Sequence, residues 1–337
     1  MINFGIVGLG LHAVKRLMPG FVAAKNCRVI ALSRRDLNKA RESARQYEIP
    51  FAFDSTESLC RCPEVHAVLV TTPNAFHLRD VLLAVECGKP VLCEKPMGLN
   101  GSECRRMVEA ARHAGVLLGV AQVFRFEESV RQMRDRVAAG EIGKPVFARS
   151  EFSFFAPADH PRTWIHDLAV AGGGPLADIG VHCIDALRFI LQDEIVRVGA
   201  QAVSDQRSGQ VESAATLLLE FSHGTLGTVM VSFRTDYRTP LELVGDAGSL
   251  RGDDAFSVDK PVVIESRRGA LATEKVTVSN QLAYTRQVDE FASAVAGRAP
   301  FPVPGEEGWK NQEVLDAAYR SMKSGKQETV QAIIMLR

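Results

Sequence analysis

An aspartate and a histidine stand four residues apart in the stretch AGGGPLADIGVHCIDALRFIL, residues 171–191. At about 100° per residue, Asp178, His182 and Asp185 fall on one stripe of a helix, and the apolar side chains of the stretch fall on the opposite side. An imidazole in that position suits general acid/base chemistry near neutral pH. The same stripe could also be an ordinary solvated helix face, and the spacing alone leaves both interpretations open.

The N-terminal stretch GIVGLGLHA contains a glycine-rich turn. Gly8, Gly10 and Ala13 form a G-x-G-x-x-A pattern directly after an apolar run and at the start of a helical one. The first glycine permits a tight turn, the second lets the backbone approach a pyrophosphate, and the small third residue allows close packing of helix on strand. Free N–H groups and the helix dipole then hold anionic oxygens. The predicted dinucleotide contacts are Gly8, Leu9, Gly10, Leu11 and His12.

The end of the second apolar run bears on the choice between NAD and NADP. It reads ALSRRD and lies roughly twenty residues after the glycines, where an NAD site usually presents Asp or Glu to the ribose hydroxyls. Ser33, Arg34 and Arg35 stand there instead. A hydroxyl and guanidinium groups can bind a 2′-phosphate, whereas a carboxylate would repel it. We therefore expect NADP(H) to be preferred and NAD(H) to be possible, unless both arginines are solvated and Asp36 only caps the next helix.

Two later apolar runs are followed by polar residues that could do chemistry, in TTPNAFH (71–77) and CEKPMG (93–98). In an open α/β sheet, ligands bind at the carboxyl ends of the strands. Both segments are therefore expected near the cofactor. A lysine such as Lys95 can polarise a substrate oxygen or exchange a proton with it, or it can simply reach solvent. The predicted cofactor contacts from these segments are Thr72, Pro73, Asn74, His77, Glu94 and Lys95.

Two patterns of elements must position these residues. From residue 1 to about 122, apolar β-branched runs alternate with helical runs, which is typical of a parallel sheet covered by helices on both faces. From residue 123 onward, strands follow one another closely after the glycine-led helix, and FSHGTLG predicts a hairpin turn. We predict an α/β protein with a doubly wound dinucleotide-binding domain (1–122) and an α+β domain (123–337) with a mostly antiparallel sheet. The second domain is expected to have helices at 127–139, 282–296 and 307–322 and strands at 146–154, 195–203, 213–221, 225–233 and 239–244.

Composition limits the partners. The 337 residues include 40 basic and 40 acidic side chains, so no net charge attracts nucleic acid or an anionic membrane. A small molecule is the expected partner. The N-terminus has no leader pattern and no run reaches the length of a membrane span, so we expect a cytoplasmic protein. The seven cysteines lack a C-x-x-C pair and are expected to be reduced.

The motifs GLGLHA, TPNAFH, CEKP and GGGPLADIGVHCID, in that order, resemble the Gfo/Idh/MocA oxidoreductase family. CEKP together with D-x-x-x-H after a glycine run is specific to this family. Supporting similarities are VFRF (123–126), the runs around FSHGTLG, LVGDAGSL (243–250), and Tyr284 ahead of QVDEFASAV. The resemblance covers essentially the whole chain.

The resemblance implies a Rossmann domain, then a C-terminal domain whose large open sheet commonly forms a homodimer or homotetramer. It also implies hydride exchange between a nicotinamide and a hydroxyl or ketone carbon of a sugar, polyol or related compound. His182 would exchange the hydroxyl proton, and Lys95 and Asp178 would hold and polarise the substrate. Whether Lys95 or His182 is the immediate proton partner is left open.

The segment HPRTWIHDLAVAGGG adds further candidates. Arg162, Trp164 and His166 could contact nicotinamide or substrate, and Trp164 is assigned to the cofactor because relatives often have a tryptophan there. His166 could equally be a surface histidine. Arg125 and Tyr284 resemble substrate-pocket positions of relatives, with ordinary packing as the alternative.

Three other interpretations are less favoured. Asp178, His182 and His166 could in principle bind a metal, but local spacing fixes no third ligand, and we expect none. A regulator that binds the cofactor without turnover is disfavoured by Lys95, Asp178 and His182. A glycosidase that uses bound NAD transiently is disfavoured by the Ser-Arg-Arg signature.

Overall fold

The computed structural model describes residues 1–206, 208–269 and 274–333. The chain divides into two compact units, one formed by Met1–Gln122 with Tyr284–Trp309 and the other by Val123–Ala283 with Lys310–Arg337. The sequence suggested a single boundary after residue 122, so the difference lies in the segment 284–309. Across the described ranges, no helix is long and apolar enough to cross a membrane.

The first unit is built on a six-stranded parallel sheet with strand order β3-β2-β1-β4-β5-β6. Strands buried on both faces read as continuous apolar runs, which is why the sequence predicted this doubly wound fold correctly. The order reverses between β1 and β4, and ligands bind at the carboxyl ends of the strands beside such a switch point. The strands are β1 (Ile2–Val7), β2 (Cys27–Ser33), β3 (Phe51–Phe53), β4 (Ala67–Val70), β5 (Val91–Cys93) and β6 (Leu118–Val120).

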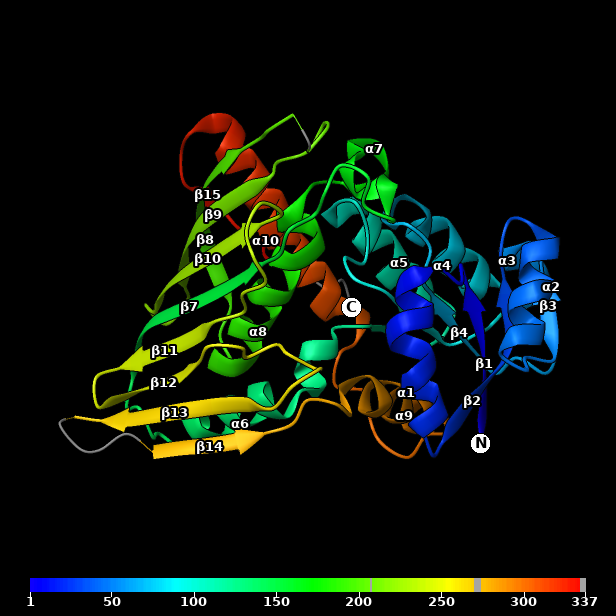
Figure 1. Cartoon of the computed structure of the whole chain (residues 1–337), viewed down its shortest axis with the longest axis horizontal. Coiled ribbons are helices and arrows are strands. Elements are labelled where there is room, and N and C mark those ends of the chain that lie inside the picture. Colours follow the sequence, from blue (N-terminus) through cyan, green and yellow to red (C-terminus); the bar gives the residue numbers. More distant parts are fainter. Residues whose placement is uncertain (207, 270–273, 334–337) are drawn as a thin grey trace. The chain divides into compact units, whose positions relative to one another are not determined.

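Helices connect these strands, as Figure 1 shows. The connection after β1 begins as a π-helix, η1, and continues as α1, and short 3-10 turns precede α4 and α6. The helical elements of the first unit are η1 (Ala13–Leu17), α1 (Met18–Ala23), α2 (Leu37–Gln46), α3 (Thr56–Cys60), η2 (Asn74–Phe76), α4 (His77–Glu86) and α5 (Gly101–His113).

Helix α9 (Ala283–Val295) and the segment after it pack on the Rossmann sheet, which explains the division of the chain. Phe291 is fully buried, and its ring lies 5.1 Å from that of Phe301 in an edge-on contact. Gly119 in β6 lets these rings approach, because a Cβ there would lie 2.7 Å from Phe301. Val120 also donates a backbone hydrogen bond to Val303 (2.9 Å). Residues 284–309 therefore extend the core of the first unit.

The second unit contains a nine-stranded sheet with strand order β14-β13-β12-β11-β7-β10-β9-β8-β15. Its pairs are antiparallel except that β10 runs parallel to β7, so the predicted mostly antiparallel open sheet is confirmed. The turn FSHGTLG joins β9 and β10 as the predicted hairpin. The strands are β7 (Pro145–Ser153), β8 (Ile195–Val203), β9 (Ala214–Phe221), β10 (Leu226–Ser232), β11 (Leu241–Gly245), β12 (Gly248–Gly252), β13 (Val262–Arg268), β14 (Glu274–Val278) and β15 (Glu328–Thr329).

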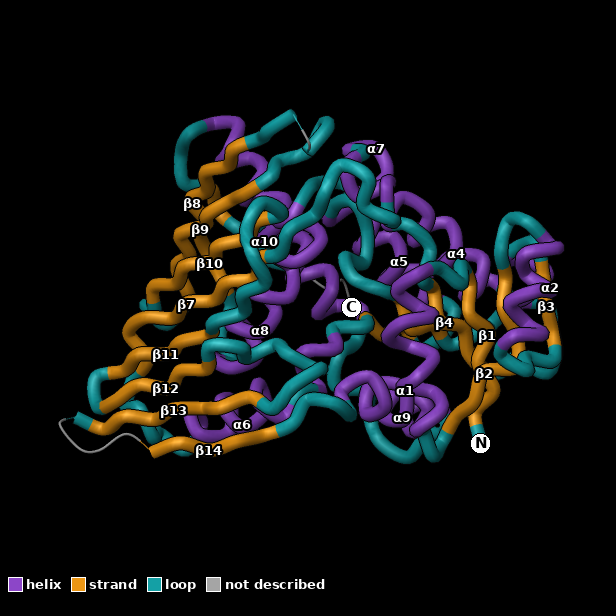
Figure 2. Tube along the Cα trace, in the orientation of Figure 1, coloured by secondary structure: helices purple, strands orange, loops and turns teal. Residues whose placement is uncertain are grey.

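Helices of the second unit lie along one face of this sheet (Figure 2). Side chains of β9 alternate between buried and exposed, as expected for a sheet with one packed face. The helical elements are η3 (Val123–Phe126), α6 (Glu128–Ala138), η4 (Thr163–His166), α7 (Leu168–Ala171), η5 (Leu176–Gly180), α8 (Val181–Leu191) and α10 (Gly305–Ser324), of which α10 begins in the first unit.

Candidate active site

The glycine-rich turn after β1 has the geometry that its sequence predicts. Gly8 has a φ of 83°, which glycine adopts without strain. A Cβ there would lie 2.6 Å from Cγ2 of Thr72 and 2.9 Å from its backbone nitrogen, so only glycine lets the two loops approach. The N–H groups of Gly8 and Leu9 donate to the carbonyl of Ser33. These two N–H groups are therefore used within the protein.

A cavity of about 600 Å³ opens at the carboxyl ends of β1, β2 and β4. Its position matches the ligand crevice of a doubly wound sheet, and its size is that of small-molecule sites. The glycine-rich turn after β1, called the glycine cradle below (Gly8, Leu9 and Gly10), and the Ser-Arg-Arg segment thus line one cavity, which fits a dinucleotide. The predicted residues that line it are Gly8, Leu9, Gly10, Ser33, Arg34, Arg35, Thr72 and Pro73.

The Ser-Arg-Arg segment carries its polar groups into this cavity. Ser33 is buried, and Arg34 is half-buried with Nη1 donating to Oγ of Ser43 at 2.9 Å. Asp36 accepts hydrogen bonds from the first N–H groups of α2. The aspartate is therefore a helix cap through its Oδ1 atom.

The E-K-P segment gathers several predicted residues of the first unit. Glu94 is buried, with Oε1 3.3 Å from Nε2 of His12 and Oε2 accepting from the backbone N–H of Lys95. Burial acts to raise the pKa of Glu94, but the adjacent His12 and Lys95 lower it below its ordinary value. The His12 ring also makes an edge-on contact with Tyr284 at 6.1 Å. The structure thus brings His12, Glu94, Lys95 and Tyr284 together.

His77 joins the two loops that carry the other predicted residues. It is buried, with Nε2 2.8 Å from the carbonyl oxygen of Thr72 and Nδ1 3.0 Å from that of Pro96. Burial lowers the pKa of His77. This placement makes it a brace between the loops. In the same unit Asn74 is buried and Leu11 is exposed.

In the second unit, Asp178 lies in the π-helical turn η5 and His182 lies in the first turn of α8. Single π-helical turns are frequent at functional sites. The two residues are only 9% and 6% exposed, which excludes a solvated helix face. Arg162 donates to Asp178, with Nη2 3.0 Å from Oδ2, and fixes the direction of that carboxylate.

Aromatic side chains surround His182. Its ring stacks on Phe124 with centroids 4.1 Å apart, and Phe124 stacks on Phe256 at 4.3 Å. Trp164 and His166 lie in η4 and are both half-buried. The guanidinium carbon of Arg162 lies 6.0 Å from the Trp164 ring centroid, so the predicted Arg162, Trp164 and Asp178 form one connected group.

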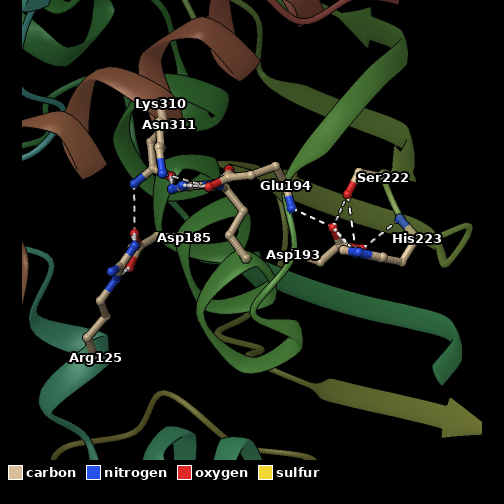
Figure 3. A network of polar contacts seen from close by, with 9 residues as sticks. Arg125, Asp185, Asp193, Glu194, Ser222, His223, Lys310 and Asn311 are labelled. Atoms are coloured by element: carbon tan, nitrogen blue, oxygen red, sulfur yellow. Dashed lines mark hydrogen bonds and ion pairs between the residues drawn. The ribbon is translucent and has the colours of Figure 1, made fainter. Parts of the chain in front are cut away.

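Arg125 and Asp185 belong to a separate, buried network. Nη2 of Arg125 lies 2.7 Å from Oδ1 of Asp185, and both side chains are buried. Asn311 donates to the same carboxylate and accepts from Arg188, which continues the network toward Glu194 (Figure 3). Arg125 therefore forms a buried ion pair with Asp185 of α8. The helical spacing had placed Asp185 on one stripe with Asp178 and His182, but its carboxylate is used in this pair.

Two residues that the sequence did not single out hold the glycine run in place. Oε1 of Glu212 accepts from the backbone N–H of Leu176 at 3.0 Å and from the Tyr319 hydroxyl at 3.1 Å. Burial raises the pKa of Glu212. A Cβ on Gly173 would overlap the Tyr319 hydroxyl, and one on Gly174 would overlap the backbone oxygen of Glu212. No local signal reveals these partners, because they come from distant segments.

Within the ranges that the structure describes, no three His, Cys, Asp or Glu side chains are gathered as a metal site. All seven cysteines are free thiols, and all but the half-buried Cys87 are buried.

Two family descriptions match the chain. Residues 2–122 match "Oxidoreductase family, NAD-binding Rossmann fold", and residues 130–251 match "GFO/IDH/MocA C-terminal domain". Together these ranges cover most of the chain.

Individual proteins are similar over nearly their full lengths. The 1,5-anhydro-D-fructose reductase of Ensifer adhaerens is 32% identical over 91% of this chain and 92% of its own. D-xylose 1-dehydrogenase (NADP(+)) 2 of Haloferax volcanii is 32% identical over 96% and 98%. The crystal structure of aldose-aldose oxidoreductase from Caulobacter crescentus, complexed with glycerol, has a TM-score of 0.89 at 26% identity and covers 97% of this chain and 99% of that one.

Proposed function

The chain belongs to the Gfo/Idh/MocA family of oxidoreductases, and from this membership we propose that it is an NADP(H)-preferring enzyme acting on a sugar, polyol or related small molecule. It moves a hydride between the nicotinamide and a hydroxyl or ketone carbon of that substrate. The observation that carries the proposal is the cavity of the first unit, where the glycine cradle lies together with Ser33 and Arg34.

The preference for NADP(H) is supported by the chemistry of that cavity. A bound nicotinamide dinucleotide supplies the hydride-carrying carbon. The backbone from Gly10 onward holds the pyrophosphate at the helix start. Ser33, Arg34 and Arg35 hold the 2′-phosphate by charge-assisted hydrogen bonds. A relative whose name specifies NADP(+), the Haloferax dehydrogenase, agrees with this assignment.

The chain's own residues handle the substrate and its proton. His182 exchanges a proton with the reacting hydroxyl, and stacking on Phe124 holds its ring in one orientation. Asp178, directed by Arg162, accepts a hydrogen bond from the substrate. Lys95, adjacent to the buried Glu94, polarises the reacting oxygen. Lys95 is the alternative proton partner of the reacting hydroxyl.

A sugar-like substrate is proposed because the relatives named above act, by their names, on an anhydrofructose, a xylose and aldoses. Hydroxyl groups of such a substrate match the hydrogen-bonding side chains of Asp178 and His182, which are 9% and 6% exposed.

A homodimer or homotetramer is proposed to form through the open face of the second sheet. A hollow of about 460 Å³ on β7, β9 and β10 is lined by Phe147, Leu218 and Leu226, each at least half exposed. Such apolar patches mark protein interfaces. Leu218→Asp is expected to lower the molar mass measured by light scattering to that of one chain, and an unchanged mass would contradict this interface.

The activity is tested by following NADPH and NADH absorbance in parallel with aldoses, ketoses and inositols. His182→Ala and Lys95→Ala are each expected to lower kcat by about 100-fold or more, and the variant with the flatter pH–rate profile identifies the proton partner. The exposed His223 and Lys25 provide the matched controls His223→Ala and Lys25→Ala. Wild-type turnover in both active-site variants would overturn the proposed chemistry.

A further inference from the structure

A buried aspartate fixes an arginine at the wall of the nucleotide cavity. Asp80, in the first turn of α4, is 0% exposed, and its Oδ1 atom accepts from Nη2 of Arg79 at 2.7 Å and from Nε at 3.0 Å. The side chain of Arg79 is 61% exposed. The two hydrogen bonds to this buried carboxylate hold the guanidinium of Arg79 in a fixed orientation. The entropy cost of ordering this long side chain is therefore met before a ligand binds.

The aspartate is itself held by two other segments. Thr56, at the start of α3, donates to Oδ1 at 2.8 Å, and Thr72, in the loop after β4, donates to Oδ2 at 2.8 Å. With four donors on one carboxylate, its acceptor positions are used within the protein. Asp80 is thus a positioning residue, and Thr72 ties it to the glycine turn that approaches the same loop.

The planar guanidinium of Arg79 forms part of the cavity wall. Its guanidinium carbon lies 5.2 Å from the ring centroid of Phe76, so one face of the guanidinium is covered by the aromatic ring. Phe76, Arg79 and Leu83 are spaced three and four residues apart on one side of a helix, and all three line the cavity that also contains Ser33 and Arg34.

We infer that Arg79 binds the adenine base of the dinucleotide by stacking, with Asp80 as the residue that positions it, an inference that rests on the proposed cofactor binding. A planar guanidinium stacks on aromatic faces. Because Asp80 already compensates its charge, Arg79 is better suited to a neutral base than to the 2′-phosphate. Phe76 and Leu83 supply the apolar surface that such a base needs.

The test is isothermal titration of the full chain with NADPH, NADH, AMP and reduced nicotinamide mononucleotide, which lacks adenine. Arg79→Ala is expected to weaken binding of the three adenine-containing ligands by about tenfold each. Binding of the mononucleotide is expected to change less than twofold, or about half a kcal/mol. Arg41→Ala, at an exposed arginine of α2 outside the cavity lining, is the matched control.

Asp80→Asn tests the positioning role. It is expected to weaken the same three ligands by a smaller factor, and to add nothing in the Arg79→Ala background, because the two residues act as one unit. If Asp80→Asn does not fold, Arg79→Lys takes its place. That variant keeps the charge but not the planar group, and it is expected to lose as much affinity as Arg79→Ala.

Two outcomes overturn the inference while the proposed function stands. In one, Arg79→Ala binds all four ligands as the wild type does. In the other, it weakens NADPH alone, so that Arg79 contacts the 2′-phosphate and not the base. Failure of the wild-type chain to bind either dinucleotide would instead overturn the proposed function.

Discussion

The imidazole of His182 lies flat on the ring of Phe124, with the centroids 4.1 Å apart and the planes at 20°. Phe124 is in turn covered by Phe256 at 4.3 Å. The histidine comes from α8 and the two phenylalanines from η3 and the segment after β12, so three distant parts of the second unit form one stack. This stack fixes the imidazole plane, and with it the direction in which His182 can exchange a proton.

Replacing Phe124 by leucine is expected to keep the apolar volume but release the imidazole plane. We expect kcat to fall about tenfold with a smaller change in KM, because a misdirected proton donor impairs the chemical step more than binding. Phe154→Leu is the control, because it makes the same change in a nearby aromatic cluster. The Phe154 ring contacts Phe152, His160 and Phe233, whereas His182 stacks directly on Phe124. Steady-state kinetics of both variants check this, and equal loss in the two would contradict the role of the stack.

Introducing a carboxylate at Ser33 is expected to reverse the cofactor preference. Ser33→Asp places a negative charge in the cavity beside Arg34 and should raise the Kd of NADPH by about 10- to 100-fold. NADH should be affected much less, because it has no 2′-phosphate. Ser33→Ala removes only the hydroxyl and is the matched control. Fluorescence titration of both cofactors measures the effect, and an unchanged Kd for NADPH would exclude Ser33 from the phosphate site.

The sequence predicted the first sheet well because its strands are continuous apolar runs. It did not predict β3, whose three residues FAF are all half-buried, or the strands β12–β14. Strands β13 and β14 contain several charged residues, as in VVIESRR and EKVTV, and these charges interrupt the apolar pattern that predicts a strand. The hairpin of β9 and β10 was predictable from its turn residues.

The residues of the candidate site likewise fall into those that local motifs identified and those that they could not. Local motifs identified the glycine cradle and Ser33, which line one cavity. They could not identify Glu212, which contacts the glycine run from 36 residues away, or the partner of Arg125, which is 60 residues distant. They also could not show that α9 packs on the Rossmann sheet, because an amphipathic helix does not specify its partner.

The glycine run should tolerate alanine unequally. A Cβ on Gly174 would overlap the backbone oxygen of Glu212, whereas one on Gly173 meets the hydroxyl end of Tyr319, which must give up its hydrogen bond to Glu212 in order to move. We expect Gly174→Ala to lower the free energy of unfolding by about 2–3 kcal/mol and Gly173→Ala by about 1 kcal/mol. Gly199→Ala, whose Cβ would have the flexible side chain of Gln327 as its nearest neighbour at 3.4 Å, should change little. Urea denaturation checks this order, and the reverse order would refute the overlap argument.

The buried carboxyl group of Glu127 should make the free energy of unfolding depend on pH. It is fully buried, and within the described part of the chain neither carboxylate oxygen has a hydrogen-bond partner. Burial raises the pKa of Glu127 well above its ordinary value. Between the unfolded and folded pKa values the native state retains a proton that the unfolded state has lost, so the free energy of unfolding falls as pH rises through this window.

Glu127→Gln removes this loss by keeping a neutral side chain of similar shape at every pH. Relative to the wild type, we expect the variant to gain at least about 1 kcal/mol in the free energy of unfolding between pH 4.5 and pH 8. Glu128→Gln, at the half-buried neighbouring position, should show no such gain. Chemical denaturation at both pH values measures the difference. A variant whose stability follows that of the wild type across this range would show that Glu127 is ionised in the folded protein.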